Sequence, residues 1–373
     1  MGPIQKPTGS SVNRLHLSQN PRIQDSLRYR ESWPALDNAM FSNSEEGNGT
    51  SVRAARCRRS TVRESATSTS GFESAPGSGD TMEVVFASKE FAESLLKERD
   101  VYTLNLNEFE LKAKLQTTNQ VSVDDYLSHA GIQGLEWQDE HIKKIELSLN
   151  SIRLALEKYQ LPLPNEVVFV ATTGLEEAGA AYTRGRAIFL PLKKIESDGI
   201  TRLIAHELVH IATRNNAVWR DKLYSKIGFY PCETPSFSEA FNYIRFSNPD
   251  APLIEHCIEV IYQGETQRVA PIIFTRSSEY QGGSFFKYIE VELLLLDKDN
   301  ETDYLLYPEE KRLISFDECE GFFEKVGYNT GYLFHAEEIL ADNVADILVG
   351  RERFDSPEII EKIIPILNLE SFN

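Results

Sequence analysis

The stretch IAHELVHI, residues 204–211, is the part of the sequence that decides the fold we expect. It places His206 and His210 four positions apart, with Glu207 directly after the first histidine. Residues four apart lie one above the other on a helix, so both imidazoles can reach one metal ion. Zinc lowers the pKa of a bound water to about 7, and a neighbouring carboxylate can take its proton. The pattern predicts a catalytic zinc site with His206 and His210 as ligands and Glu207 as general base.

The helix itself is predicted from the apolar residues around this motif. They repeat at helical spacing to about Thr213, and Ser197 or Asp198 can cap the start. The simpler alternative is that both histidines are polar positions on an amphipathic helix. Their neighbours are mostly bulky and apolar, however, and burying polar side chains without partners costs on the order of a few kcal/mol. A metal ion supplies the missing partner.

A second stretch, HAEEILADNV at residues 335–344, offers a third ligand, because catalytic zinc usually has three from the protein. A helix there places Glu338 and Asp342 four positions apart on one face. Glu338 is the candidate ligand, and Asp342 can accept the second N–H of a ligating histidine. Glu337 is the rival ligand. From spacing alone, a solvated acidic face remains the alternative.

HELVH at residues 206–210 together with EILAD at 338–342 resembles the gluzincin metallopeptidases, such as the thermolysin-like and lethal-factor-like enzymes. In these enzymes the ligand glutamate lies on a later helix, followed four positions on by an acidic residue. The resemblance implies zinc ligands His206, His210 and Glu338, general base Glu207 and outer-shell partner Asp342. It also implies a sheet whose edge strand aligns a peptide substrate beside the metal.

Further motifs resemble a family of uncharacterised bacterial proteins to which a metallopeptidase domain is ascribed, over about residues 137–350. These motifs are HELVH, LYSKIGF (223–229), SNPDAP (247–252) and NTGYLFHAEEILADN (329–343). Residues 248–252 form a predicted turn, which is either only a turn or the rim of a substrate cleft.

Peptide hydrolysis also needs a group that stabilises the oxyanion of the tetrahedral intermediate. Tyr332, six residues before Glu338, resembles the placement of a tyrosine in lethal-factor-like enzymes, and His335 is the second candidate. The alternatives are a packed core tyrosine and a histidine at a helix N-terminus.

The expected fold is α+β, a zincin-like core over residues 83–373 with a small mixed sheet, an active-site helix and a ligand helix. A β-rich insertion at about residues 215–325 separates the two halves of the site. The elements we expect are a helix at 137–159, a strand at 166–171, a strand or a hairpin turning at Arg184-Gly185 over 180–190, strands near 258–262, 270–274 and 285–296, and helices at 336–349 and 357–364, the last stopped by Pro365.

In residues 1–80 the apolar residues follow no sustained helical or strand period, and Ser, Thr, Gly, Asn and Arg are frequent. This composition predicts a disordered leader. The alternative is that translation starts at Met82 and that residues before it come from a start placed too early. Residues 1–80 hold 10 Lys/Arg and 8 Asp/Glu, so all of the net charge of −18 belongs to the remainder. Such acidity argues against nucleic-acid partners. No apolar run is long enough to span a membrane and no secretory signal is evident. We expect a cytoplasmic protein, or one exported by a non-Sec route.

The four cysteines lie far apart with no C-x-x-C pair, which favours free thiols over cysteine ligation of zinc. The leading interpretation is therefore a zinc-dependent metallohydrolase, a peptidase acting on a peptide or protein substrate. Two alternatives stay open: a non-catalytic protein stabilised by a closed metal site, and a delivered effector or toxin protease. Neither the substrate nor the oligomeric state follows from the sequence.

Overall fold

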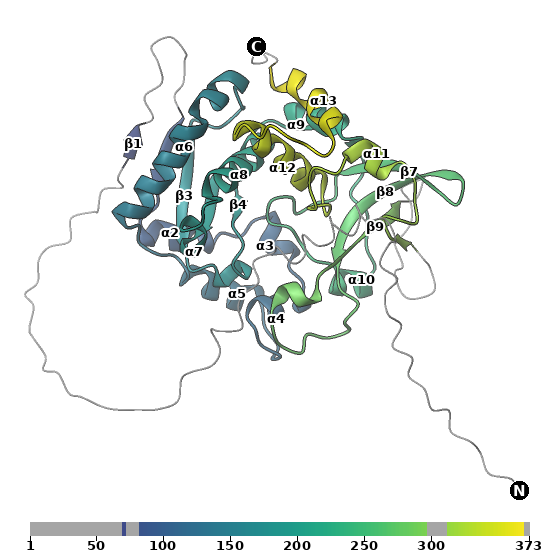
Figure 1. Cartoon of the computed structure of the whole chain (residues 1–373). Helices are drawn as coiled ribbons and strands as arrows, with labels where there is room; N and C mark the ends of the chain where they lie inside the picture. The colour runs from purple at the N-terminus through teal and green to yellow at the C-terminus, as the bar shows by residue number, and fades with distance from the viewer. Residues whose placement is uncertain (1–68, 72–81, 297–311, 369–373) are drawn as a thin grey trace, which may run out of the picture. The chain divides into compact units, whose positions relative to one another are not determined.

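A computed structural model describes residues 69–71, 82–296 and 312–368 of the chain. All of them belong to one unit that extends from Val52 to Asn373. The leader predicted over residues 1–80 lies outside the described residues, apart from three residues that form a short strand. The described chain folds as helices with two separate sheets, so the predicted α+β class is confirmed (Figure 1).

The first sheet has the strand order β1-β2-β3-β5-β4. Its strands are β1 (Thr69–Gly71), β2 (Glu83–Phe86), β3 (Glu166–Thr172), β4 (Tyr182–Arg184) and β5 (Ala187–Pro191). β2, β3 and β5 run parallel, whereas β1 and β4 are antiparallel to their neighbours. The predicted hairpin alternative is right, because β4 and β5 join at Gly185, whose φ of 56° favours glycine. The hairpin leaves β4 as an edge strand.

The second sheet confirms that the predicted insertion is rich in strands. Its order is β10-β9-β8-β7-β6, and every pair is antiparallel. The strands are β6 (Phe229–Pro231), β7 (His256–Tyr262), β8 (Glu265–Phe274), β9 (Glu290–Leu296) and β10 (Leu313–Ile314). Residues 285–288, predicted as strand, form the short 3₁₀ helix η3 (Phe285–Tyr288) instead.

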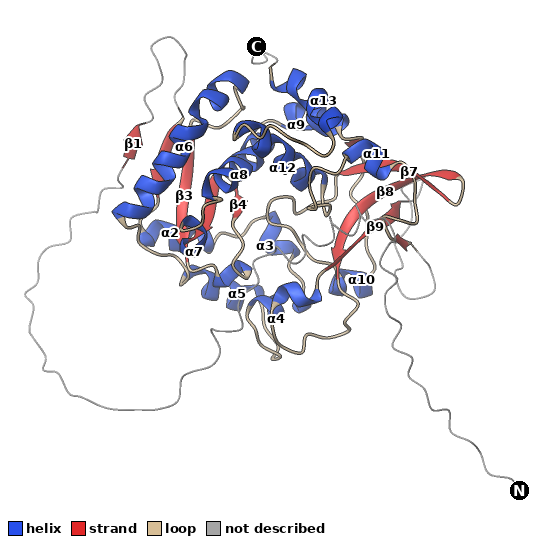
Figure 2. Cartoon of the chain, viewed as in Figure 1, coloured by secondary structure: helices blue, strands red, loops and turns tan. Residues whose placement is uncertain are grey.

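Three helices position the candidate site: α6 (Asp139–Tyr159), α8 (Ile200–Asn215) and α12 (Ala336–Leu348). Their predicted positions are confirmed to within a few residues. α8 lies against α6 on one side and α12 on the other, as can be followed in Figure 2. α8 also contacts β4 and β5, so the helix with the histidine motif is fixed between the first sheet and the helix with Glu338.

The N-terminal part of the fold consists of helices that pack on the first sheet or lead into it. They are α2 (Lys89–Leu96), α3 (Val101–Asn105), α4 (Glu108–Lys114), α5 (Val123–Gly131), η2 (Leu175–Glu177) and α7 (Leu192–Ile195). A buried apolar cluster joins side chains of α2, α3 and α5 to β3 and β5. This core fixes β5, and with it the β4–β5 hairpin, next to α8.

Two predicted helix ends are wrong. α8 starts after Gly199 without a side-chain cap, because the hydroxyl of Ser197 donates to the carbonyl of Lys194 at the end of α7. The last helix, α13 (Pro357–Leu367), continues through Pro365. The missing proline N–H is tolerated there because only the final turn follows, which is closed by a bond from the Asn368 N–H to the Ile364 carbonyl.

The first part of the predicted β-rich insertion contains helices that sequence periodicity did not reveal. They are α9 (Ala217–Lys226) and α10 (Glu239–Ile244), and α11 (Phe322–Val326) follows the second sheet. α9 buries only Trp219, Leu223 and Tyr224, so it lacks a continuous apolar stripe. None of the helices in the described ranges has the length and apolarity needed to cross a bilayer.

Candidate metal site

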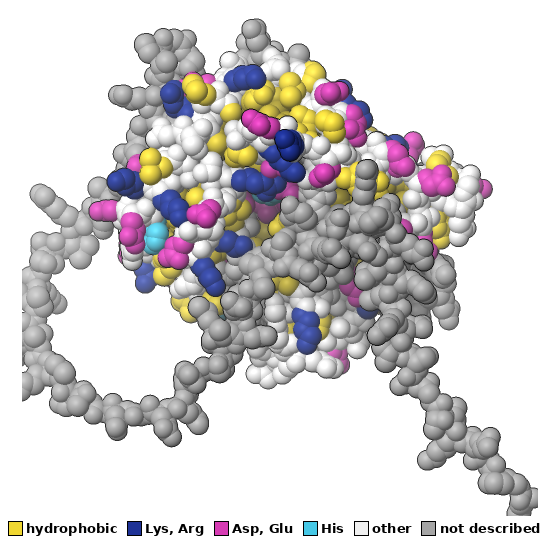
Figure 3. Space-filling view, viewed as in Figure 1, with side chains coloured by type: hydrophobic (Ala, Val, Ile, Leu, Met, Phe, Trp, Pro, Cys, Tyr) yellow, Lys and Arg dark blue, Asp and Glu magenta, His cyan; other side chains and the backbone are white. Residues whose placement is uncertain are grey.

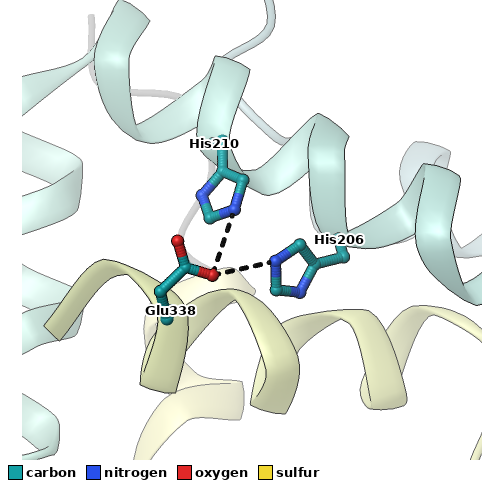
Figure 4. A group of neighbouring side chains, drawn as sticks. All are labelled: His206, His210 and Glu338. Atoms are coloured by element: carbon teal, nitrogen blue, oxygen red, sulfur yellow. Dashed lines mark hydrogen bonds and ion pairs between the residues drawn. The ribbon is translucent and has the colours of Figure 1, made fainter. Parts of the chain in front are cut away.

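The two histidines and Glu338 come from two helices that pack side by side. α8 is buried along most of its length, and every residue of α12 from Ala336 to Leu348 is buried. Helix periodicity places His206 and His210 on the face of α8 that meets α12, and Glu338 lies on the facing side of α12 (Figure 4). The packing of two buried helices therefore brings together residues 128 positions apart in sequence, counting from 210 to 338.

The three side chains converge on one point. Nε2 of His206 lies 3.2 Å from Oε2 of Glu338, and Nε2 of His210 lies 3.6 Å from the same oxygen (Figure 4). The ligand atoms of all three residues lie within 4.8 Å of one another. Two imidazole nitrogens and one carboxylate oxygen form a donor set that suits zinc. The structure thus brings the three predicted ligands together in an arrangement that could hold a metal ion.

The outward-facing nitrogen of each imidazole is held by a carboxylate. Oδ1 of Asp342 lies 3.0 Å from Nδ1 of His206, as the sequence predicted. Oε1 of Glu337 lies 2.8 Å from Nδ1 of His210 and also accepts from the Thr213 hydroxyl. Carboxylates in these positions fix the ring orientation and leave Nε2 free for a metal. Glu337, the rival ligand, therefore lies behind His210 and not at the convergence point.

Further polar residues, which sequence patterns did not single out, surround these carboxylates. Arg202 donates to Asp342 and Asp346, with distances of 2.9 and 2.6 Å, and the Thr330 hydroxyl donates to Oδ2 of Asp342. Burial raises the pKa of the Asp342 carboxyl, but the His206 and Arg202 partners outweigh it and lower the pKa to about 2. Asp342, which contacts Nδ1 of His206, is thus kept in its ionised form.

Buried atoms without partners indicate that the site suits a metal ion. Among the described buried side chains, Nε2 of His210 and Oε2 of Glu207 have no hydrogen-bond partner. Leaving a buried polar atom unpaired costs about 1–3 kcal/mol. A cation at the convergence point would pair with Nε2 of His210 directly and would offset the buried negative charge of Glu338.

Glu207 lies next to the cluster on α8, as predicted, and its environment is electrostatically unusual. Burial raises its pKa to about 8, with a further contribution from the nearby charge of Asp250. A cation bound by the neighbouring histidines would lower this pKa again, because it favours the ionised carboxylate. Glu207 is thus a buried acid or base whose charge depends on what the cluster holds.

The two oxyanion candidates lie in different environments. The ring of Tyr332 is 6.4 Å from that of His206, beside the first histidine, and burial raises the pKa of its hydroxyl, which keeps it a donor. His335 is the N-cap of α12, and its Nδ1 accepts from the Glu337 N–H at 3.0 Å. Burial lowers its pKa to about 4, consistent with a neutral capping ring. Tyr332 thus keeps a hydroxyl that can donate, whereas Nδ1 of His335 is engaged in capping α12.

A cavity of about 310 Å³ lies beside the second histidine. Its lining includes Thr213 and Glu337 from behind His210, Gly185 from the β4 hairpin, and Asp250. The volume lies at the lower end of the range of small-ligand sites, enough for a few side-chain-sized groups. The lining contains the carboxylate partner of His210 but none of the three candidate ligands, so the cavity lies behind His210.

Comparison of the chain with protein-family models, with curated proteins and with solved structures finds no match. The class of the site therefore rests on its own geometry.

Proposed function

We propose that this protein is a zinc-dependent hydrolase, and specifically a gluzincin-like peptidase. The observation that carries the proposal is the convergence of Nε2 of His206 and Nε2 of His210 on one oxygen of Glu338. The two carboxylates behind the rings, Asp342 and Glu337, add to it, because ligating histidines are usually held in this way. His206, His210 and Glu338 would be the ligands.

Glu207 and Tyr332 would supply the other groups that hydrolysis needs. A bound zinc ion would supply a Lewis acid that polarises a carbonyl and activates a water at neutral pH. Glu207, adjacent to the ligands, would accept the proton of the attacking water and return it to the leaving amine. Tyr332, as a protonated hydroxyl beside His206, would donate to the oxyanion.

A peptide substrate is favoured by the neighbouring sheet. β4 is an edge strand, and it contacts α8. All three residues of β4 are buried, but its edge, once uncovered, could pair with an extended peptide through backbone hydrogen bonds and hold the scissile bond beside the metal ligands. Nucleic acid is a poor alternative, because Lys/Arg and Asp/Glu side chains are interspersed over the face in Figure 3, where no broad basic patch is seen among the described residues.

Metal removal tests this proposal. Zinc-loaded protein is expected to cleave bonds in a mixture of unstructured peptides, and exhaustive chelation is expected to abolish cleavage until one equivalent of zinc is returned. Mass spectrometry of the peptide mixture would detect the products whichever peptide sequence is cleaved. The matched control is the His206→Ala, His210→Ala double variant, in which returned zinc should restore nothing. Cleavage that survives chelation would contradict a metal-dependent mechanism.

A further inference from the structure

The segment SNPDAP, residues 247–252, lies beside the candidate metal site and contacts Glu338. Nδ2 of Asn248 donates to Oε1 of Glu338 at 2.7 Å. The other oxygen of that carboxylate is the one that faces both histidines. Asn248 therefore fixes the orientation of Glu338, and it brings the backbone of its own segment next to the cluster.

Two residues later, Asp250 takes the hydrogen bond that an extended substrate would need. Its Oδ1 accepts from the backbone N–H of Thr183 at 2.7 Å and from the Thr183 hydroxyl at 2.6 Å. Thr183 is the central residue of β4, and its N–H points away from the paired strand β5. A peptide that added to the sheet as a further strand would pair with this N–H. With Asp250 in place, that edge is occupied.

Asp250 also lies beside one of the metal ligands and the candidate general base. A carboxylate oxygen of Asp250, one of Glu207 and a ring nitrogen of His210 all lie within 4.8 Å of one another. Oε2 of Glu207 and Nε2 of His210 are among the buried side-chain atoms of the described residues that have no hydrogen-bond partner. A cation bound to His210 could therefore also reach a carboxylate oxygen of Asp250.

We propose that Asp250 is the fourth protein ligand of the metal, and that residues 248–250 thereby close the site to substrate. This inference rests on the proposed function, since it assigns a resting state to the same metal site. Peptide hydrolysis at this site would need an open coordination position and a free β4 edge, and Asp250 takes up both. Hydrolysis then requires residues 248–250 to withdraw.

The closed state is stabilised by contacts on both sides of Asn248. The N–H of Ser247 donates to the buried Glu110 carboxylate of α4 at 2.6 Å. The guanidinium of Arg214 donates to the carbonyl of Asp250 at 3.2 Å and to the Thr183 hydroxyl at 2.9 Å. α4 and α8 thus hold the segment from two directions, which makes closure the resting arrangement of the chain.

The test measures access to the metal, not hydrolysis. Co²⁺ replaces zinc, and its visible absorption band reports on the coordination shell while acetohydroxamate, a small chelating probe, is titrated in. Asp250→Asn keeps a carbonyl oxygen for Thr183 but removes a good metal ligand. The affinity of this variant for the probe is expected to exceed that of the wild type by at least about tenfold, because Asp250 no longer has to leave the metal before the probe binds. Asp355→Asn, the same change at an exposed position, is the control and should match the wild type.

The possible outcomes separate the two proposals. A Co²⁺ band in the wild type with equal probe affinity in the wild type and Asp250→Asn would overturn the closure and leave the metal site standing. Binding of the probe to the wild type at micromolar concentration would by itself overturn the closure, so this outcome can be read even if the variant does not fold. Absence of any Co²⁺ band in the wild type would contradict the metal site itself, and the closure with it.

Discussion

Replacing Glu338 with alanine is expected to abolish zinc binding at the concentrations at which the wild type is saturated. Glu338 supplies the only carboxylate oxygen toward which both histidine Nε2 atoms point among the described residues. Loss of an outer-shell partner typically weakens metal affinity by about 10- to 100-fold, and loss of a ligand should cost more than that. Competition titration against a chelating dye would measure the affinity.

Glu337→Ala and Glu352→Ala make this prediction specific. Glu337 holds Nδ1 of His210, the Thr213 hydroxyl and the Tyr224 hydroxyl, so its loss should weaken zinc by about 10- to 100-fold without abolishing binding. Glu352 is exposed, so its replacement should change nothing. The expected order of zinc affinity is wild type equal to Glu352→Ala, then Glu337→Ala, then Glu338→Ala. If Glu337→Ala lost zinc and Glu338→Ala kept it, the ligand assignment would be reversed.

Glu207→Gln is expected to leave zinc binding intact and to remove catalysis. Glutamine keeps the size of the side chain but cannot accept the proton of the attacking water. General-base catalysis contributes about 10²- to 10⁴-fold, so kcat/KM for a cleaved peptide should fall by that factor. Steady-state kinetics on any peptide identified in the cleavage screen, with zinc content measured on the same sample, would check both halves of this expectation.

The same variant separates catalysis from folding. Glu207 is buried with one unpaired oxygen and a pKa raised to about 8, so a neutral glutamine should not destabilise the apo protein strongly. A far-UV circular dichroism spectrum and a denaturation midpoint like those of the wild type are therefore expected. Undiminished hydrolysis in a zinc-loaded Glu207→Gln sample would refute the role of general base.

Much of the candidate site could be predicted because it lies on helices. His206 and His210 are four positions apart on α8, and Glu338 and Asp342 are four apart on α12. This spacing places each pair on one face of its helix, regardless of the structure of the chain between the two helices. The fold class and the main strands followed from equally local patterns of apolar residues. Periodicity within an element is a short-range property, so the sequence carries it directly.

The residues that could not be predicted act through long-range contacts. Asn248 and Asp250 belong to a turn with no period of its own, and their partners, Glu338 and Thr183, lie on separate elements. Only the SNPDAP motif pointed to this segment, as a possible rim of the cleft. The place of Glu337 was also hidden, because its partner Tyr224 lies on α9, a helix whose sequence lacks an apolar stripe. Loop positions relative to a site depend on tertiary packing that no local pattern encodes.

X-ray absorption spectroscopy at the zinc edge of the loaded wild type tests the central claim most directly. The account predicts one zinc per chain with nitrogen and oxygen neighbours at about 2.0–2.2 Å and scattering from two imidazole rings. The described cysteines Cys232, Cys257 and Cys319 are free thiols but lie outside the candidate ligand group. A sulfur neighbour at about 2.3 Å, or a shell without imidazole, would contradict the site formed by His206, His210 and Glu338.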